Sequence, residues 1–302
     1  MTTTAHQSLL PRLQGSMVAL VTPMHANGDV DYPSLSNLIE WHIEQGTDCI
    51  VAVGTTGESA TLSVQEHIAV VEFTVKQVKG RIPVIAGTGA NNTVEAIELT
   101  QLAKGVGVDA VLLVAPYYNK PTQEGIYQHY KAIAQAVDIP QILYNVPGRT
   151  IVDIQQATVE RLADIDNIIA IKDATGDVAR GAALVAAVQG RMIVLSGDDA
   201  TAVELMQAGA KGNISVTANI VPKQMHEIFT LALQGDFDKA HAINQCIAQL
   251  HQDLFIESSP LPVKYALYKM GKIEQGIRLP LTWLSAQCQP KIDATLAKVG
   301  LL

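Results

Sequence analysis

The sequence predicts an α/β protein, a closed (β/α)8 TIM barrel with a helical C-terminal extension. Eight short runs are rich in β-branched and other apolar residues, which is typical of parallel strands buried on both faces. Segments rich in alanine, leucine and glutamine with helical periodicity lie between these runs. Successive runs begin roughly 20 to 35 residues apart, the spacing of a strand–helix unit, and so many consecutive units favour a closed barrel over a doubly wound sheet.

The predicted strands follow one another regularly along the chain. They occupy residues 16–23, 48–54, 82–87, 109–116, 140–145, 167–173, 191–199 and 212–219. Helical periodicity is clear over 93–104, 124–136 and 153–163, which follow the capping candidates Asn92 or Thr93, Thr122, and Asp153. Further helical segments and no convincing strand follow residue 220. We therefore expect residues 1–219 to form the barrel core, and residues 220–302 its last helix and the extension.

Composition narrows the classes of partner. The 302 residues are 48% apolar, and the formal net charge is −8 with no basic stripe, which argues against nucleic acid and anionic membranes. The cysteines Cys49, Cys246 and Cys288 have neither disulfide nor metal-site spacing and suit a reducing compartment. Residues 1–15 lack the basic region and the apolar core of a signal peptide, and no apolar run would span a bilayer. We expect a cytoplasmic protein.

A lysine stands at the end of an apolar strand. Active sites on TIM barrels lie in the loops after the strands. Lys172 ends such a run and is predicted to share a face with Ala170 and Ile168. Burial there disfavours the ammonium and lowers its pKa, and only the neutral amine attacks a carbonyl. Tyr144 ends the preceding strand about 4.8 Å away and is placed to relay protons. The alternatives are a solvated strand end and a tyrosine that covers the core.

Two further loops at this rim offer groups that bind anions. Thr55 and Thr56 lie between glycines in the segment 53–59, where backbone amides can turn toward an anion. Arg149 is the only arginine in the eight rim loops, and a guanidinium is suited to clamp a carboxylate. An ordinary turn and a surface arginine are the alternatives for these features.

Other chemistries fit the residues less well. A metal-dependent aldolase needs converging histidines, but the histidines lie mostly in helical segments, and Asp198 and Asp199 have no obvious nitrogen ligands beside them. The same two carboxylates oppose the phosphate site that a pyridoxal phosphate enzyme would need. A lysine that forms a Schiff base with a small keto acid remains, and it requires no cofactor and no metal.

Three motifs together resemble a known family. The segments GTTGE (54–58), YNVPGRT (144–150) and IKDATG (171–176) resemble the pyruvate-dependent class I aldolase and lyase family, and the resemblance extends over essentially the whole chain. It implies that Lys172 condenses with pyruvate and that the resulting enamine attacks L-aspartate-4-semialdehyde. The implied product is 4-hydroxy-tetrahydrodipicolinate, on the diaminopimelate route of lysine biosynthesis.

The resemblance also assigns roles around Lys172. It implies a homotetramer, built as a dimer of dimers, in which Tyr118 reaches the active site of a neighbouring subunit. It gives Tyr144, Thr56 and Tyr118 to proton relay, and Thr55 and Thr56 to the pyruvate carboxylate. Three further positions are implied to contact or border the substrates: Arg149, Gly197 and the carbonyl of Ile214.

Alternatives within and outside this family remain. N-acetylneuraminate lyases usually have serine at the position of Thr55 and lack an arginine at that of Arg149. Both residues therefore favour the members that condense pyruvate with L-aspartate-4-semialdehyde. Another lyase that acts on a sugar acid is the second candidate. A catalytically silent keto-acid sensor is the third, although the intact Lys172 and Tyr144 oppose it.

Regulation by L-lysine is a further implication of the resemblance. In lysine-sensitive members two lysine molecules bind at the tight dimer interface. The matching positions are Ser59, Ala60, His67, Asn91, Glu95 and Tyr117. Val64 stands where sensitive members often have histidine, so we expect partial inhibition of modest affinity. The alternative for Glu95 is a carboxylate that only stabilises the first turn of its helix.

Overall fold

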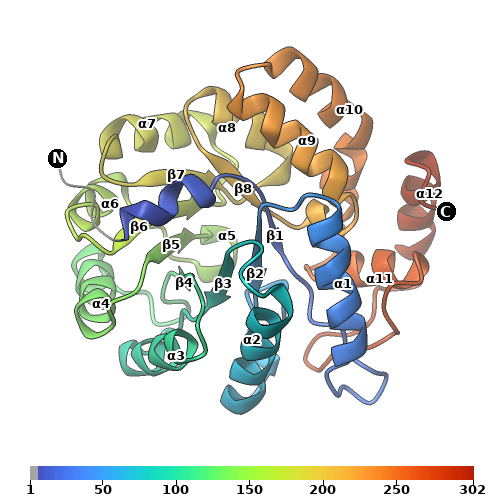
Figure 1. Ribbon diagram of the computed structural model, residues 1–302, viewed down its shortest axis with the longest axis horizontal. Helices are drawn as coiled ribbons and strands as arrows, with labels where there is room; N and C mark the ends of the chain where they lie inside the picture. Colours follow the sequence, from blue (N-terminus) through green and yellow to red (C-terminus); the bar gives the residue numbers. More distant parts are fainter. Residues whose placement is uncertain (1–5) are drawn as a thin grey trace.

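Eight parallel strands close a barrel in the computed structural model, which describes residues 6–302 (Figure 1). The strands pair in chain order, and β1 pairs with β8 to complete the closure. Their bounds are β1 Gly15–Ala19, β2 Cys49–Ala52, β3 Val84–Gly87, β4 Ala110–Val114, β5 Gln141–Asn145, β6 Ile168–Asp173, β7 Ile193–Ser196 and β8 Gly212–Ser215. The predicted fold class is confirmed.

Helices surround the strands on the outside of the barrel (Figure 1). The α-helices are α1 Tyr32–Glu44, α2 Val64–Val78, α3 Thr93–Gly105, α4 Gln123–Ala136, α5 Pro147–Thr150, α6 Gln156–Leu162, α7 Val178–Val188, α8 Ala202–Gln207, α9 Pro222–Leu233, α10 Phe237–Asp253, α11 Leu261–Lys269 and α12 Gln289–Lys298. The short 3-10 helices are η1 Gln7–Arg12, η2 Ser59–Thr61, η3 Asp199–Thr201 and η4 Thr217–Asn219.

Several strands end before the apolar run that predicted them. Strand β1 ends at Ala19, yet Leu20 and Val21 stay buried against the surrounding helices. Strand β8 ends at Ser215, and the next residues turn into η4. The apolar pattern continues because residues just beyond the strand ends are also buried, and Leu20 still donates a backbone hydrogen bond to Val51 of β2.

Two of the three predicted helix caps are confirmed and one is wrong. The Asn92 side chain accepts a hydrogen bond from the Val94 amide, and Thr122 accepts one from the Gly125 amide. Asp153 does not cap α6, which begins at Gln156 after Gln155. The Asp153 carboxylate instead contacts Asn145 and Arg180, so a tertiary contact takes the side chain that local sequence assigned to the helix.

The alternation predicted for β6 also fails at one residue. Ile168 pairs with Gln141, but Ala170 pairs with Ile142, so Ile169 is an extra residue that the partner strand does not match. Ile169 and Ala170 therefore pack inside the barrel, and Ile168 packs on the outside under the helices. The prediction that Ile168 lies beneath Lys172 is wrong, because a bulge reverses the facing of every residue below it.

The first residues described cover the N-terminal end of the barrel. Leu9, Leu10 and Leu13 pack against the apolar side chains that fill the barrel interior. The opposite end, where the strands finish, is the one that carries the cavity described below. Residues 1–5, part of the segment assessed for a signal peptide, lie outside the described residues.

The chain after residue 220 is helical, as predicted. Helix α9 packs along β1, α10 packs on α9, and α11 and α12 pack on each other. Within residues 6–302 no helix is both long enough and apolar enough to cross a bilayer.

Candidate active site

A cavity of about 230 Å³ opens at the end of the barrel where the strands finish. Five of the predicted site residues line it, namely Thr55, Thr56, Tyr144, Arg149 and Lys172, and the predicted Gly197 also borders it. These residues come from the loops or strand ends of β2, β5, β6 and β7. The structure thus gathers at one site residues that are separated by more than a hundred positions in the chain.

The Lys172 amine packs on the aromatic ring of Tyr144. They are register partners on β6 and β5, and the Lys172 Nζ lies 4.2 Å from the centroid of the Tyr144 ring. Lys172 is 5% exposed and Tyr144 is 8% exposed, so neither side chain is a solvated strand end. The structure therefore holds the Lys172 amine on an aromatic face with little exposure to solvent, where it can act as a nucleophile toward a carbonyl carbon.

Gly197 leaves room for the lysine stem. A Cβ atom at residue 197 would lie 2.6 Å from the Lys172 Cε and 2.7 Å from the Ala174 Cβ. Any larger residue here would therefore displace the lysine side chain. The prediction that Gly197 borders the site has a steric reason in this structure.

Hydrogen bonds from Thr22 and Lys264 hold the turn that carries Thr55 and Thr56. The Thr22 hydroxyl donates to the carbonyl of Gly57, 2.7 Å away. The Lys264 ammonium donates to the Thr22 carbonyl and to the Glu58 carboxylate, at 3.1 and 2.5 Å. Both charged side chains of the Lys264–Glu58 pair are fully buried. The C-terminal helix α11 thereby helps to fix this turn.

Lys264 is the other deeply buried lysine, and its environment differs from that of Lys172. Burial lowers the pKa of Lys264, and the Glu58 carboxylate opposes that shift. The amine is engaged by two oxygen acceptors and does not line the cavity. Of the two lysines buried within residues 6–302, Lys172 is the one that lines the cavity.

Arg149 reaches the cavity from the short helix α5. Its Nη2 donates to the carbonyl of Ser259, 3.2 Å away. Ser259 and Phe255 also line the cavity, and neither was predicted from the sequence. The Ser259 hydroxyl is buried and has no hydrogen-bond partner among the described residues. No local pattern marks these two residues, because they follow α10 in the C-terminal helical part of the chain.

Two predicted residues do not line this cavity. Tyr118 is 89% exposed, and its backbone adopts the left-handed region with φ of 72°. Ile214 is buried inside the barrel, and Val216, two residues later, lines the cavity instead. Tyr118 is therefore exposed at the surface and is not part of the cavity lining of its own chain.

The adjacent carboxylates Asp198 and Asp199 serve the local fold. Asp198 accepts from the amide and the hydroxyl of Thr201. Asp199 accepts from the Asn213 side chain and from the amides of Val216 and Thr217. Neither carboxylate meets a histidine or cysteine in a metal-binding cluster among residues 6–302.

A second cavity of about 470 Å³ lies beside the first. It contains five of the six predicted lysine-binding residues, Ser59, Ala60, His67, Glu95 and Tyr117. The sixth, Asn91, adjoins it by donating from its side chain to the Tyr117 carbonyl, 3.1 Å away. Thr55 and Arg149 line both cavities, so the two share a wall.

Burial shifts the pKa values of two polar side chains at the second cavity. Burial lowers the pKa of His67, and its Nε2 donates to the Gly87 carbonyl at 2.8 Å, which leaves Nδ1 as an acceptor. Burial and the nearby Glu95 raise the pKa of Tyr117, which keeps its phenol protonated. A carboxylate, a neutral imidazole and a phenol at one cavity suit an ammonium ligand.

Comparison with known proteins identifies the family of this chain. The Dihydrodipicolinate synthetase family matches residues 12–299. A 4-hydroxy-tetrahydrodipicolinate synthase of Psychrobacter sp. (strain PRwf-1) is 68% identical over 291 residues, which cover 96% of each chain. The chain belongs to the dihydrodipicolinate synthetase family. The family expected from the three motifs is confirmed.

Solved structures of this dihydrodipicolinate synthetase family superpose closely. Chloride-inhibited dihydrodipicolinate synthase from Acinetobacter baumannii, complexed with pyruvate, has 60% identity and a TM-score of 0.95, covering 96% of this chain and all of that one. DHDPS from Cyanidioschyzon merolae with lysine bound has 36% identity and a TM-score of 0.93, covering 96% of this chain and 99% of that one.

Proposed function

We propose that this protein condenses pyruvate with L-aspartate-4-semialdehyde to form 4-hydroxy-tetrahydrodipicolinate, in the diaminopimelate pathway of lysine biosynthesis. The observation that carries the proposal is the Lys172 amine on the Tyr144 ring, in a cavity that Thr55, Thr56 and Arg149 also line. Relatives named 4-hydroxy-tetrahydrodipicolinate synthase, at 68% and 66% identity, support the same reaction. The enzyme is a lyase that works in the direction of carbon–carbon bond formation.

The residues divide the chemistry between them. The neutral Lys172 amine adds to the C2 carbonyl of pyruvate, and the carbinolamine loses water to give an imine. The Tyr144 phenol, with Thr56, carries the protons of that step and of enamine formation. The enamine carbon attacks the aldehyde of the second substrate. The amine of that substrate then attacks the imine carbon, closes the ring and releases Lys172.

Binding of the two carboxylates is assigned to different groups. The turn of Thr55 and Thr56 holds the pyruvate carboxylate, because backbone amides and hydroxyls converge there. The Arg149 guanidinium clamps the carboxylate of L-aspartate-4-semialdehyde. Gly197 provides the space for the lysine stem.

The test of this function is an assay of both substrates. With pyruvate and L-aspartate-4-semialdehyde together, we expect consumption of one molecule of each per molecule of product. N-acetylneuraminate and 2-keto-3-deoxy acids are expected to yield no pyruvate, because Thr55 and Arg149 match the synthase. Efficient cleavage of a sugar acid would contradict the proposal, and adduct formation without any turnover would favour the keto-acid sensor.

We further propose a homotetramer built as a dimer of dimers. The exposure of Tyr118, whose backbone has a φ of 72°, supports a role in the neighbouring active site. In that arrangement Tyr118 joins Tyr144 and Thr56 as a proton relay supplied by the partner subunit. We also propose the division of the chain at residue 219 into a barrel core and a helical C-terminal part.

A cytoplasmic location is proposed because the three cysteines are unpaired.

Inhibition by L-lysine is proposed at the second cavity. Its support is the gathering of Ser59, Ala60, His67, Glu95 and Tyr117 around one space, with Asn91 beside it. The wall shared through Thr55 and Arg149 gives the ligand a route to influence the active site. Val64 is half exposed at the start of α2 and supplies no polar group.

We therefore expect L-lysine to inhibit partially and with modest affinity. Glu95→Ala removes the charge partner of the ligand's ammonium, so the lysine concentration for half-maximal inhibition should rise roughly ten- to a hundredfold. Turnover without lysine should stay nearly unchanged. The matched control is Glu98→Ala, on the same exposed helix but outside the cavity, which should retain full sensitivity. Full activity at saturating lysine would mean that the cavity is not a regulatory site.

A further inference from the structure

The two residues that follow Tyr144 and Lys172 face the opposite way and meet each other. Asn145 and Asp173 are the next register partners along β5 and β6. Both are buried, at 0% and 3% exposure, on the outer side of the barrel wall. The Asn145 amide nitrogen donates to the Asp173 carboxylate, 3.2 Å away. Tyr144 and Lys172 are therefore each followed by a residue that makes a polar contact on the outer side of the barrel wall.

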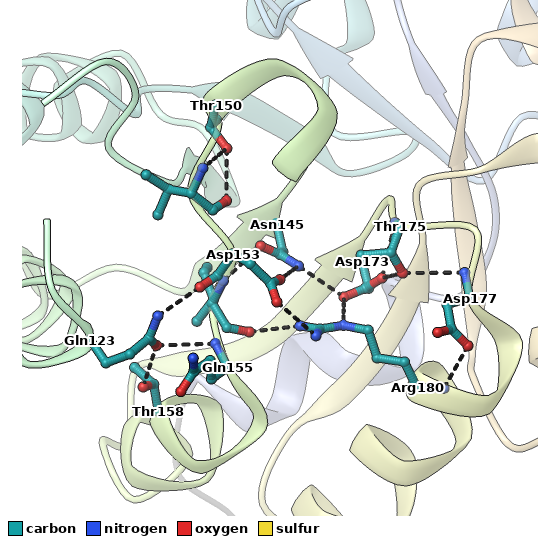
Figure 2. Close-up of polar contacts among 12 residues, drawn as sticks. Gln123, Asn145, Thr150, Asp153, Gln155, Thr158, Asp173, Thr175, Asp177 and Arg180 are labelled. Atoms are coloured by element: carbon teal, nitrogen blue, oxygen red, sulfur yellow. Dashed lines mark hydrogen bonds and ion pairs between the residues drawn. The ribbon is translucent and has the colours of Figure 1, made fainter. Parts of the chain in front are cut away.

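Arg180, near the start of α7, joins this contact to the loop after β5 (Figure 2). Its Nε donates to Asp173 at 3.1 Å, its Nη1 to Asp153 at 3.1 Å, and its Nη2 to the carbonyl of Ile154 at 2.7 Å. Asn145 donates its other amide hydrogen to Asp153, at 2.8 Å, and accepts from the amide of Ile154 at 2.9 Å.

The network is fully satisfied at its buried centre. The second oxygen of Asp173 accepts from the amide and the hydroxyl of Thr175. Both amide hydrogens and the carbonyl oxygen of Asn145 are also used. Buried polar groups with all their partners present fix one geometry, whereas removal of one partner leaves an unpaired group. We call Asn145, Asp153, Asp173 and Arg180 the rear clasp.

The bulge in β6 explains why a clasp is needed at this end. Below the extra residue Ile169 the two strands pair in one register, and above it they pair in another. A slip of one residue would turn Lys172 out of the cavity and bring Asp173 in. The contact between Asn145 and Asp173 exists only in the register that points Lys172 and Tyr144 inward.

We propose that Arg180 is a positioning residue, which through the rear clasp holds Lys172 and Tyr144 in the geometry that forms the pyruvate imine. Arg180 touches neither substrate in this scheme and does not line the cavity. The inference rests on the proposed function, because it concerns the rate of imine formation on Lys172. It adds a residue outside the cavity to those that determine this rate.

The test measures how fast and how completely pyruvate is trapped. The protein is mixed with pyruvate, samples are reduced with borohydride at successive times, and the adduct per chain is determined by mass spectrometry. Arg180→Met is expected to slow the rate constant roughly ten- to a hundredfold, because small misplacements of reacting groups have effects of that size. The final amount should still reach one adduct per chain, since the Schiff-base lysine is intact.

Arg191→Met is the matched control. Arg191 follows the other end of α7 and also joins a carboxylate, Asp164 at 2.8 Å, to two backbone carbonyls, but far from Lys172. It should leave the rate constant unchanged. Arg180→Lys keeps the charge with fewer contacts and should give an intermediate rate; it carries the test if Arg180→Met does not fold.

The outcomes separate positioning from a general effect on folding. A normal rate constant in both Arg180 variants would overturn the inference. So would a smaller final amount of adduct formed at the normal rate, since that indicates a loss of folded protein alone. Equal slowing in Arg191→Met would also overturn it. If the unmodified protein forms no adduct, the proposed function fails first, and the inference fails with it.

Discussion

Replacing Lys172 with alanine is expected to abolish the pyruvate adduct that borohydride traps, and to lower kcat by at least about a thousandfold. Among residues 6–302 no other amine lines the cavity, so the covalent step has no substitute. The native protein should gain one reduced adduct per chain, and peptide mapping should place it on Lys172.

The control for this experiment is Lys269→Ala, which removes a partly exposed lysine paired with Asp293 on the surface. It should retain the adduct and the activity. An adduct on Lys264 or Lys269 in the native protein would contradict the assignment. So would continued trapping in the Lys172→Ala variant.

Arg149→Ala is expected to separate the two substrates. The pyruvate adduct should form at nearly the normal rate, because the carboxylate of pyruvate is held by the turn of Thr55 and Thr56. Condensation with L-aspartate-4-semialdehyde should fall roughly ten- to a hundredfold or more, because a charge-assisted contact contributes about 1.5 to 3 kcal/mol. Borohydride reduction at successive times measures adduct formation, and a steady-state assay on the same preparation measures condensation.

Arg161→Ala provides a comparison of equal size. Arg161 on α6 pairs at the exposed surface with Glu124 on α4, and its replacement should affect neither step. If Arg149→Ala lost adduct formation to the same degree as condensation, Arg149 would belong to the pyruvate site. In that case the second carboxylate would need another partner, and the Ser259 hydroxyl, which lines the cavity and has no hydrogen-bond partner among the described residues, is a candidate.

The sequence predicted the barrel well because buried parallel strands leave a strong local signal. All eight strands lie where apolar runs predicted them, and Lys172 and Tyr144 face each other as the strand alternation near the rim implied. Thr55, Thr56 and Arg149 were found because rim loops of a barrel converge, so membership of a loop was enough.

The errors have a different origin, since they depend on contacts between distant residues. Ile168 was misplaced because a bulge has no signature in a run of isoleucines. Asp153 was read as a cap because its partner Arg180 lies 27 positions away. Phe255 and Ser259 were missed because only the packed C-terminal helices bring them over the cavity. Such residues are recognisable once the tertiary fold is known, and not before.

The buried pair between Lys264 and Glu58 makes the site dependent on the last part of the chain to be synthesised. The two residues are 206 positions apart, which a ribosome adding roughly 5 to 20 residues per second covers in about 10 to 40 seconds. Strand β8 already ends at Ser215, so a nascent chain holding the whole barrel still lacks the partner of Glu58. A carboxylate left buried and unpaired costs about 3 to 5 kcal/mol, so the turn of Thr55 and Thr56 stays open until α11 arrives. We therefore expect a chain that is stalled or truncated before Lys264 to bind no pyruvate.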